Sequence, residues 1–175
     1  MKQTESAYQK LRHPFGPIFD ESSRVLMLGT FPSPKSREYG IPYGNPHNRF
    51  WRVMAQILNE PFPETNEKKI EMLLRHHIAL WDVLESCEIK GASDASIKNP
   101  RVNDLTEIFA KADIFAIFCT GTKATELYRK LAEPKFQRPC IGLPSTSPAN
   151  ARYKLNDLVE AYDLINQYLD DSQEI

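Results

Sequence analysis

Short runs of apolar residues alternate along the chain with longer segments in which apolar residues recur at helical spacing. Four runs are too short for helices and end in turn residues, which is typical of strands buried in a parallel sheet. These runs cover residues 25–29, 78–84, 114–119 and 139–143. Amphipathic helices are predicted at residues 48–58, 66–77, 104–112, 122–131 and 154–169, with a short helix within residues 1–12. Strands that alternate with helices predict an α/β/α sandwich around a mostly parallel sheet.

Length and composition are those of an ordinary globular protein. The chain has 175 residues, of which 41% are hydrophobic and 26% are charged, so we expect one domain spanning residues 1–175. No apolar run approaches the roughly 20 residues of a membrane-spanning helix, and the first residues lack the apolar segment of a signal peptide. We therefore expect a cytoplasmic monomer that has no membrane partner.

The cysteines and the net charge limit the cellular compartment, the cofactors and the partners that are compatible with this sequence. Cys87, Cys119 and Cys140 are odd in number and far apart in the sequence, which indicates a reducing compartment. Three thiols cannot supply the four ligands of an iron–sulfur cluster. The net charge of −1 gives no general argument for nucleic acid, so DNA binding would need a local positive face.

A long polar loop at residues 30–48 follows the first predicted strand. It combines two aromatic residues, Phe31 and Tyr43, with two carboxamides, Asn45 and Asn48. Its prolines and glycines are Pro32, Pro34, Gly40, Pro42, Gly44 and Pro46. Prolines reduce the entropy lost when a loop takes one shape, and ligands bind beyond the carboxyl ends of parallel strands. The loop is either a rigid binding element or a connector without a role.

Two further strand ends carry polar residues and would meet this loop at one edge of the sheet. Thr120, Gly121 and Thr122 begin a helix, where free backbone amides could bind a phosphate or the turn could simply cap the helix. The segment LPSTSPANAR at 143–152 is predicted to form a tight, polar turn beside Lys154. It could contact a DNA phosphate and push a side chain into a duplex, or serve only as a turn.

The remaining polar candidates are weaker. His76 and His77 have no partner at metal-ligand spacing, which favours structural histidines. Asp82 follows Trp81 in a predicted strand and is either a structural or a catalytic carboxylate. Trp51 and Trp81 are predicted core residues. The sequence contains no Walker loop, dinucleotide-binding glycine motif or Ser–His–Asp pattern.

Three motifs and their spacing resemble the uracil-DNA glycosylase superfamily. They are GTFPS at 29–33, PYGNPHNRFW at 42–51 and LPSTSPANAR at 143–152. The branch they resemble most is that of the DNA-deoxyinosine (hypoxanthine) glycosylases, which are related to the mismatch-specific uracil/thymine glycosylases. The resemblance implies a three-layer α/β/α sandwich with a central four-stranded parallel sheet. It also implies a monofunctional enzyme of base-excision repair that uses neither a metal nor another cofactor. Its partner would be DNA containing a deaminated base.

The resemblance also implies where the catalytic residue lies. In the mismatch enzymes, an asparagine that positions water directly precedes the proline of the first motif. Phe31 occupies that position here and cannot hydrogen-bond a water molecule. In the deoxyinosine branch the essential asparagine lies in the segment that reads NPHN in this chain. We therefore favour Asn48 as the catalytic residue, with Asn45 as the alternative.

The other roles implied by the resemblance concern the base and the DNA strand. Tyr43 would stack on the base, and the backbone amides of Thr30, Phe31 and Ser33 could donate to it. The segment that contacts DNA would comprise Ser145, Thr146, Ser147, Pro148, Ala149, Asn150 and Arg152. A local positive face could come from Lys35, Arg37, Arg49, Arg52, Lys123, Arg152 and Lys154.

Three other functions stay open at this point. The same fold could act on uracil in G·U mismatches or single strands. The protein could also bind lesions without cleaving them, and Phe31 is the residue that favours this alternative. A small-molecule hydrolase or nucleotidase is disfavoured because the usual nucleophile and metal motifs are missing.

Overall fold

The computed structural model describes residues 7–173 and contains a large and a small β-sheet. The strands are β1 Gln9–Arg12, β2 Val25–Gly29, β3 Ile78–Asp82, β4 Leu84–Ile89, β5 Lys98–Val102, β6 Ala116–Thr120 and β7 Ile141–Leu143. The α-helices are α1 Pro34–Tyr39, α2 Phe50–Ile57, α3 Asn66–Arg75, α4 Thr106–Lys111, α5 Thr122–Leu127, α6 Glu133–Phe136, α7 Leu155–Tyr162 and α8 Leu164–Ser172. A 3₁₀ turn, η1 Asp94–Ser96, and a π-helical turn, η2 Tyr128–Ala132, complete the elements.

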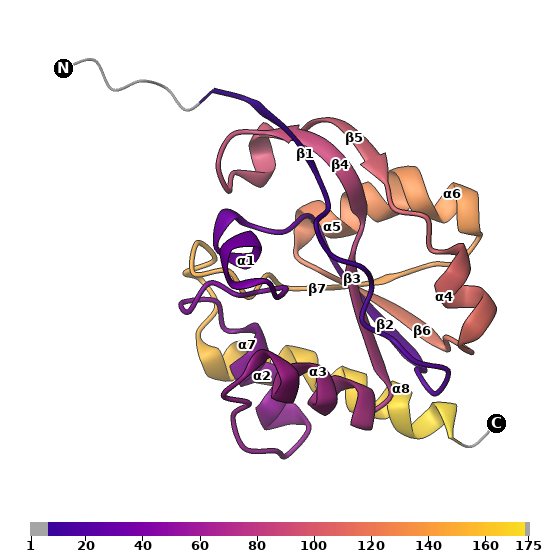
Figure 1. Ribbon diagram of the computed structural model, residues 1–175. Coiled ribbons are helices and arrows are strands. Elements are labelled where there is room, and N and C mark those ends of the chain that lie inside the picture. The colour runs from indigo at the N-terminus through magenta and orange to yellow at the C-terminus, as the bar shows by residue number, and fades with distance from the viewer. Residues whose placement is uncertain (1–6, 174–175) are drawn as a thin grey trace.

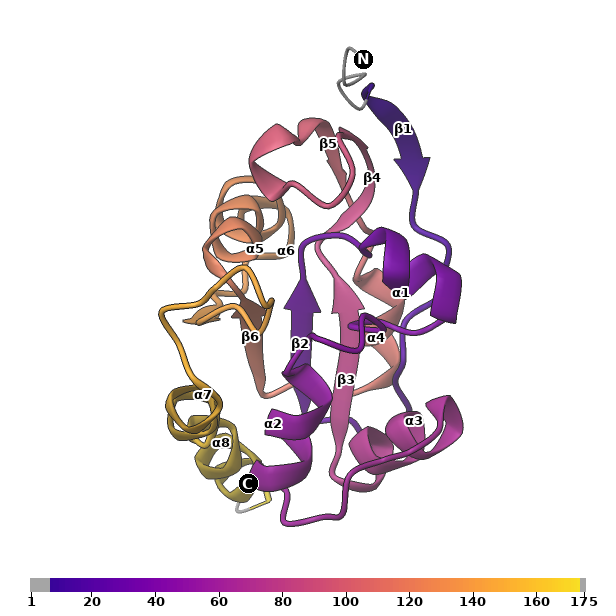
Figure 2. The ribbon, with the colours of Figure 1, turned by 90° about the vertical axis from the view of Figure 1, so that its left-hand side faces the viewer.

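The large sheet is parallel and has the strand order β3-β2-β6-β7. Gly29 at the end of β2 lies opposite Asp82 at the end of β3, and Thr120 of β6 lies opposite Leu143 of β7. All four strands therefore end at one edge of the sheet. Helix α1 lies beyond the carboxyl ends of β2 and β3 (Figure 2).

The two faces of this sheet are each covered by helices. In β2, Val25 and Met27 pack in the cluster formed with α2, α3, α7 and α8, whereas Leu26 and Leu28 pack in the cluster formed with α4 and α5. This alternation follows from the two-residue period of a strand, and all four side chains are fully buried. The two helical layers lie on opposite sides of the sheet (Figure 1). The predicted three-layer sandwich with a four-stranded parallel sheet is confirmed.

The small antiparallel sheet, with the order β1-β4-β5, was not predicted. The helix predicted within residues 1–12 is wrong at Gln9–Arg12, which pairs with β4; residues 1–6 lie outside the described residues. The strand predicted at 78–84 ends at Asp82, where the Val83 N–H donates to the Gly29 carbonyl at 2.7 Å, and the chain then enters β4. Cross-strand pairing supplies a stabilisation that apolar periodicity does not reveal.

Three other boundaries differ from the prediction. The loop after β2 contains α1, which begins at the Ser33 cap and ends at Gly40 with a left-handed φ of 71°. The helix predicted to reach residue 131 passes into η2, and the closing helix is divided at Asp163. These local breaks leave the helical layers in place, because their apolar faces still pack on the sheet.

The three cysteines are free and buried. Burial raises the pKa of the Cys87 thiol to about 11, so this group stays protonated near neutral pH. Within residues 7–173, no helix has the length and apolar character needed to cross a bilayer.

Candidate active site at the carboxyl edge of the sheet

A cavity of about 350 Å³ lies at the edge of the sheet where the parallel strands end. The predicted site residues that line it are Thr30, Phe31, Ser33, Tyr43, Asn45, Asn48, Ser145, Thr146, Ser147, Pro148 and Ala149. Asn150 and Arg152 are not among its lining residues. The three motifs are more than 100 positions apart at their extremes, and the topology brings them to one place.

The first wall of the cavity is the turn around α1. The Ser33 hydroxyl accepts from the Ser36 N–H at 3.2 Å, and the Ser36 hydroxyl accepts from the Gly44 N–H at 3.1 Å. These bonds link the start of the loop to its end. The Ser33 hydroxyl is thus occupied as a helix cap, so only its backbone amide remains for a ligand.

The floor contains Tyr43, whose ring stacks on Phe50 with centroids 4.0 Å apart and planes 15° from parallel. Its hydroxyl lies 2.5 Å from the Thr120 hydroxyl oxygen. Burial, followed by the Asp82 carboxylate, raises the pKa of Tyr43 well above its ordinary value, so the phenol stays neutral. Since Phe50 covers one face of the ring, only the opposite face is left for a base.

The side-chain oxygen of Asn48 connects the start of α2 to the segment 143–153 on the other side of the cavity. Asn48 Oδ1 accepts from the Phe50 N–H at 2.9 Å and from the Thr146 hydroxyl at 2.7 Å. These two bonds fix the orientation of the carboxamide and use both lone pairs of its oxygen. The Nδ2 amino group is therefore the part of Asn48 that can contact a water molecule or a nucleotide.

Asn45 differs from Asn48 in how it is held. Its Oδ1 accepts from the His47 N–H at 2.9 Å, a local bond within an exposed turn. Asn48 is instead anchored to a residue 98 positions away. A catalytic group must be held in one geometry, so the structure gives a physical reason to favour Asn48.

Arg49 organises the second wall, which is the segment 143–153. Its guanidinium donates to the carbonyls of Ser147 at 2.8 Å, Asn150 at 3.1 Å and Tyr153. Arg49 was predicted to contribute to a positive face, but its donors are turned to the protein itself. Asn150, predicted to lie near the DNA wedge, donates to the Ser145 carbonyl at 2.9 Å.

Arg49→Ala is expected to loosen this segment and to lower the free energy of unfolding by about 1–2 kcal/mol, because three carbonyls, two of them in part-buried bonds, lose a charged donor. Thermal or urea unfolding measures the change. Arg52→Ala on the next turn of α2 is the matched control, since Arg52 is exposed, and it should unfold like the parent protein. Equal stability of both variants would show that the Arg49 bonds contribute nothing.

At the turn Thr120–Thr122, where free amides could bind a phosphate, the amide of Gly121 is already occupied. The Gly121 N–H donates to the Leu143 carbonyl at 2.7 Å, which joins the ends of β6 and β7. A methyl group at Gly121 would lie 3.3 Å from the Ser145 Cβ, and the φ of Gly121 is 93°. The turn thus brings the 143–153 segment close to β6, and its glycine is needed for that approach.

Two polar groups of this region were not among the predicted site residues. Asp94 of η1 lines the cavity, and desolvation raises the pKa of its carboxyl. His13 bonds Asp82, which also lines the cavity. The sequence pattern did not indicate a role for either residue, because His13 precedes the first predicted strand and Asp94 lies in a segment without apolar periodicity.

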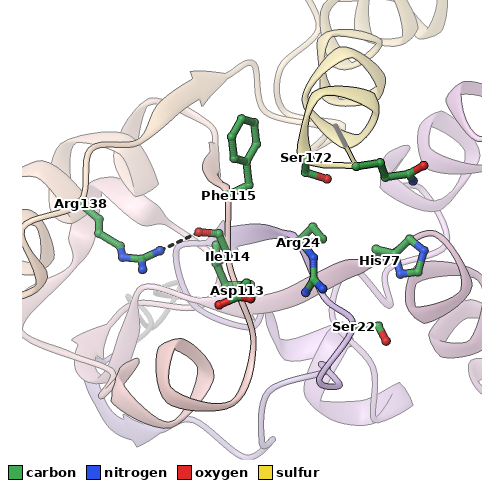
Figure 3. Close-up of a pocket in the computed structure, with 9 residues that line it drawn as sticks. Ser22, Arg24, His77, Asp113, Ile114, Phe115, Arg138 and Ser172 are labelled. Atoms are coloured by element: carbon green, nitrogen blue, oxygen red, sulfur yellow. Dashed lines mark hydrogen bonds between the residues drawn. The ribbon is translucent and has the colours of Figure 1, made fainter. Parts of the chain in front are cut away.

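A second cavity, of about 560 Å³, lies at the opposite, amino edge of the sheet (Figure 3). Arg24, His77, Asp113 and Arg138 line it, and Arg138 donates to the Ile114 carbonyl at 2.8 Å. None of the predicted catalytic, base-binding or DNA-binding residues lies there. The first cavity is therefore the candidate active site.

Comparison with known proteins agrees with this fold. The family model of the uracil DNA glycosylase superfamily matches residues 17–170. The chain belongs to this superfamily, and the resemblance noted in the motifs is confirmed.

Particular relatives are known. A protein named hypoxanthine DNA glycosylase, from Methanosarcina acetivorans, is 31% identical over 83% of this chain and 92% of its own length. One of the same name from Methanosarcina barkeri is 34% identical over 79% of this chain and 87% of its own length. A solution NMR structure from M. acetivorans, named as a candidate uracil DNA glycosylase, is 29% identical. It superposes with a TM-score of 0.78 over 93% of this chain and 99% of that chain.

Proposed function

We propose that this protein is a monofunctional DNA glycosylase that hydrolyses the N-glycosidic bond of a deaminated base in DNA, with hypoxanthine as the principal base. The observation that carries the proposal is the single cavity into which all three motifs project side chains. Two relatives of 31% and 34% identity, both named hypoxanthine DNA glycosylase, support the choice of base.

The cavity suits a base that has left the duplex. An enzyme that cleaves the bond at C1′ must first flip the nucleotide out of the stack, at a cost of a few kcal/mol. The free face of Tyr43 would return roughly 1–3 kcal/mol of this cost by stacking on the base. Weak pairing of a deaminated base lowers the cost further and thereby contributes to selectivity.

Cleavage needs a positioned water molecule and stabilisation of the departing base. Asn48 would donate from Nδ2 to the water oxygen and so place it against C1′, because its Oδ1 is already occupied. A carboxamide is not a strong base, so its contribution is orientation. Negative charge grows on the leaving base, and backbone amides of Phe31 and Ser33 at the cavity wall would stabilise it.

The segment 143–153 would contact the DNA strand. Pro148 and Ala149 are exposed and also line the cavity, so they lie at its rim. Arg152 and Lys154 are exposed beside them and would neutralise phosphates. In this assignment Arg49 shapes the DNA-contacting segment instead of binding DNA directly.

A base-release assay tests the proposal. Duplexes that carry one deoxyinosine, deoxyuridine or deoxyxanthosine are incubated with the protein, and alkali then cleaves the strand at each abasic site. Faster cleavage at deoxyinosine than at deoxyuridine is the expected result. Cleavage at deoxyuridine alone would move the protein to another branch of the superfamily, and no cleavage by folded protein would overturn the proposal.

A further inference from the structure

The small sheet has one apolar face and one positively charged face. Cys87 and Ile89 of β4 are buried, and Leu11 of β1 packs in the same cluster. Successive side chains of a strand point to opposite faces, and residues directly opposite each other on antiparallel strands share a face. The outer face therefore carries the alternate residues, which the register arranges in two rows: Lys10–Glu88–Lys98 and Arg12–Ser86–Arg101. These rows bring four exposed cations to one side of the sheet.

The outer face retains its positive charge within the folded protein. Glu88 is the acidic residue of the two rows, and its carboxylate accepts from the side-chain amide of Asn99. In the described part of the chain, no ion pair involves any of the four cations. A hollow of about 540 Å³ on this side is lined by Lys10, Arg12 and Arg101. The face is thus concave and positive, although the whole chain has a net charge of −1.

A fifth cation, Lys90, joins one end of this face. Lys90 Nζ lies 4.7 Å from the centre of the Tyr8 ring, and Lys98 Nζ lies 4.3 Å from the same centre. The ring therefore holds two like charges close together through cation–π contacts. Side chains that are already held in place lose less entropy when they bind an anion. An anion between them also relieves the repulsion of the two ammonium groups.

The end of the sheet that carries this lysine pair also forms a wall of the candidate active site. Ile89 at the end of β4, together with Ala92 and Asp94 of the connection to β5, lines the cavity. Lys90 and Lys98 lie at the two ends of this connection. The small sheet lies beyond the carboxyl ends of β2 and β3, on the side of the molecule away from α7 and α8 (Figure 1, Figure 2). DNA with a nucleotide in the cavity would therefore meet the segment 143–153 at one wall and the small sheet at another.

We propose that the outer face of the small sheet, beginning with Lys90 and Lys98 beside the cavity, binds the phosphate backbone of one duplex arm that extends from the flipped nucleotide. This inference rests on the proposed function and adds a second contact surface to the segment 143–153. The occupant is DNA because the face is polar, cationic and continuous with the cavity that would hold the base. Contacts to phosphates carry no sequence information, so this surface would hold the duplex in any sequence context.

Lys90→Gln/Lys98→Gln tests the inference through the salt dependence of DNA binding. The probe is a duplex with a central tetrahydrofuran abasic analogue, which offers no base to the cavity and so reports contacts to the backbone. Each phosphate contact adds about 0.9 to the slope of log affinity against log salt, so the slope should fall in magnitude by about 1–2 and the affinity at about 0.1 M salt by about 10-fold. Lys69→Gln/Lys135→Gln is the matched control and should bind like the parent protein, because these lysines also lie over aromatic rings but do not line the cavity or the hollow.

Duplexes shortened on one side of the abasic analogue locate the contact. From Lys90 to Ser86 the face extends for about 13 Å along β4, which is the length of about four base-pair steps. An arm cut to a single base pair would not cover it. Shortening the arm that lies on the small sheet should lower the affinity of the parent protein and abolish its advantage over Lys90→Gln/Lys98→Gln. Shortening the other arm should preserve that advantage.

The inference and the proposed function can fail separately. If folded Lys90→Gln/Lys98→Gln protein binds with the affinity and salt slope of the parent protein, the inference is wrong. An equal loss in the control variant, or a difference that persists when either arm is shortened, would show that only the overall charge matters, which also overturns it. Release of hypoxanthine by the parent protein is measured beside these experiments, and its absence would overturn the proposed function whatever the binding results.

Discussion

Asn48→Ala is expected to lower the rate of hypoxanthine release by about 10²–10³-fold, the size of effect that follows loss of one positioned polar group from an active site. The substitution removes the Nδ2 donor from the cavity. It also removes the oxygen that accepts from the Phe50 N–H and the Thr146 hydroxyl. Single-turnover kinetics with excess protein measures the chemical step apart from DNA binding.

Two variants separate these contributions. Asn48→Asp keeps an oxygen for Phe50 and Thr146 but replaces the amino group, so a similarly slow reaction would assign the effect to Nδ2. Asn45→Ala removes the alternative candidate, whose bond is local and exposed, and should change the rate by less than about 10-fold. If Asn45→Ala released hypoxanthine slowly and Asn48→Ala released it at the parent rate, Asn45 would be the catalytic residue instead of Asn48.

Gly29→Ala is expected to reduce base release by about 10²-fold, because misplacing active-site groups by about 1 Å can cost that much. A methyl group on Gly29 would lie 2.5 Å from Asp82 Oδ1 and 2.8 Å from the Tyr43 hydroxyl. One or both side chains must move from the floor of the cavity. Relative to the parent protein, Gly29→Ala should show both slower base release and lower affinity for a duplex with 2′-fluorinated deoxyinosine, whose glycosidic bond resists hydrolysis.

Gly16→Ala is the control for this substitution, since no atom lies within 4 Å of the added methyl group. It should leave base release unchanged. Circular dichroism and thermal unfolding show whether the Gly29→Ala protein is folded. Its affinity for a duplex that carries a tetrahydrofuran abasic analogue shows whether the DNA-binding surface is intact. A folded Gly29→Ala protein with the parent rate would show that the floor of the cavity tolerates displacement.

The main architecture was predictable because it depends on local apolar patterns. The residues of β2 form a continuous apolar run, and a run of that kind can be buried on both faces only between two helical layers. The small sheet was missed because β5, with the sequence KNPRV, has exposed and half-buried residues. Its strands are held by pairing with β4, which no local pattern reveals.

The candidate site was predictable in part for a similar reason. Parallel strands end at one edge, so the loop after β2 and the segment after β7 were expected to meet there, and both line the cavity. The roles of individual polar groups were not predictable. Arg49 resembled a DNA-binding cation in the sequence, yet it bonds carbonyls about 100 residues away.

By itself, the sequence determined the class of fold, the edge of the sheet that carries the candidate site and the motifs that meet there, because the alternation of strands with helices and the composition of the loops are local features. Only the tertiary structure decided that the Asn48 side-chain oxygen is occupied by Thr146, where Arg49 directs its donors and that His13 bonds Asp82. These are contacts between residues 69 to 98 positions apart. Hydrogen bonds of that kind depend on distances of a few tenths of an ångström, which packing sets and residue spacing does not.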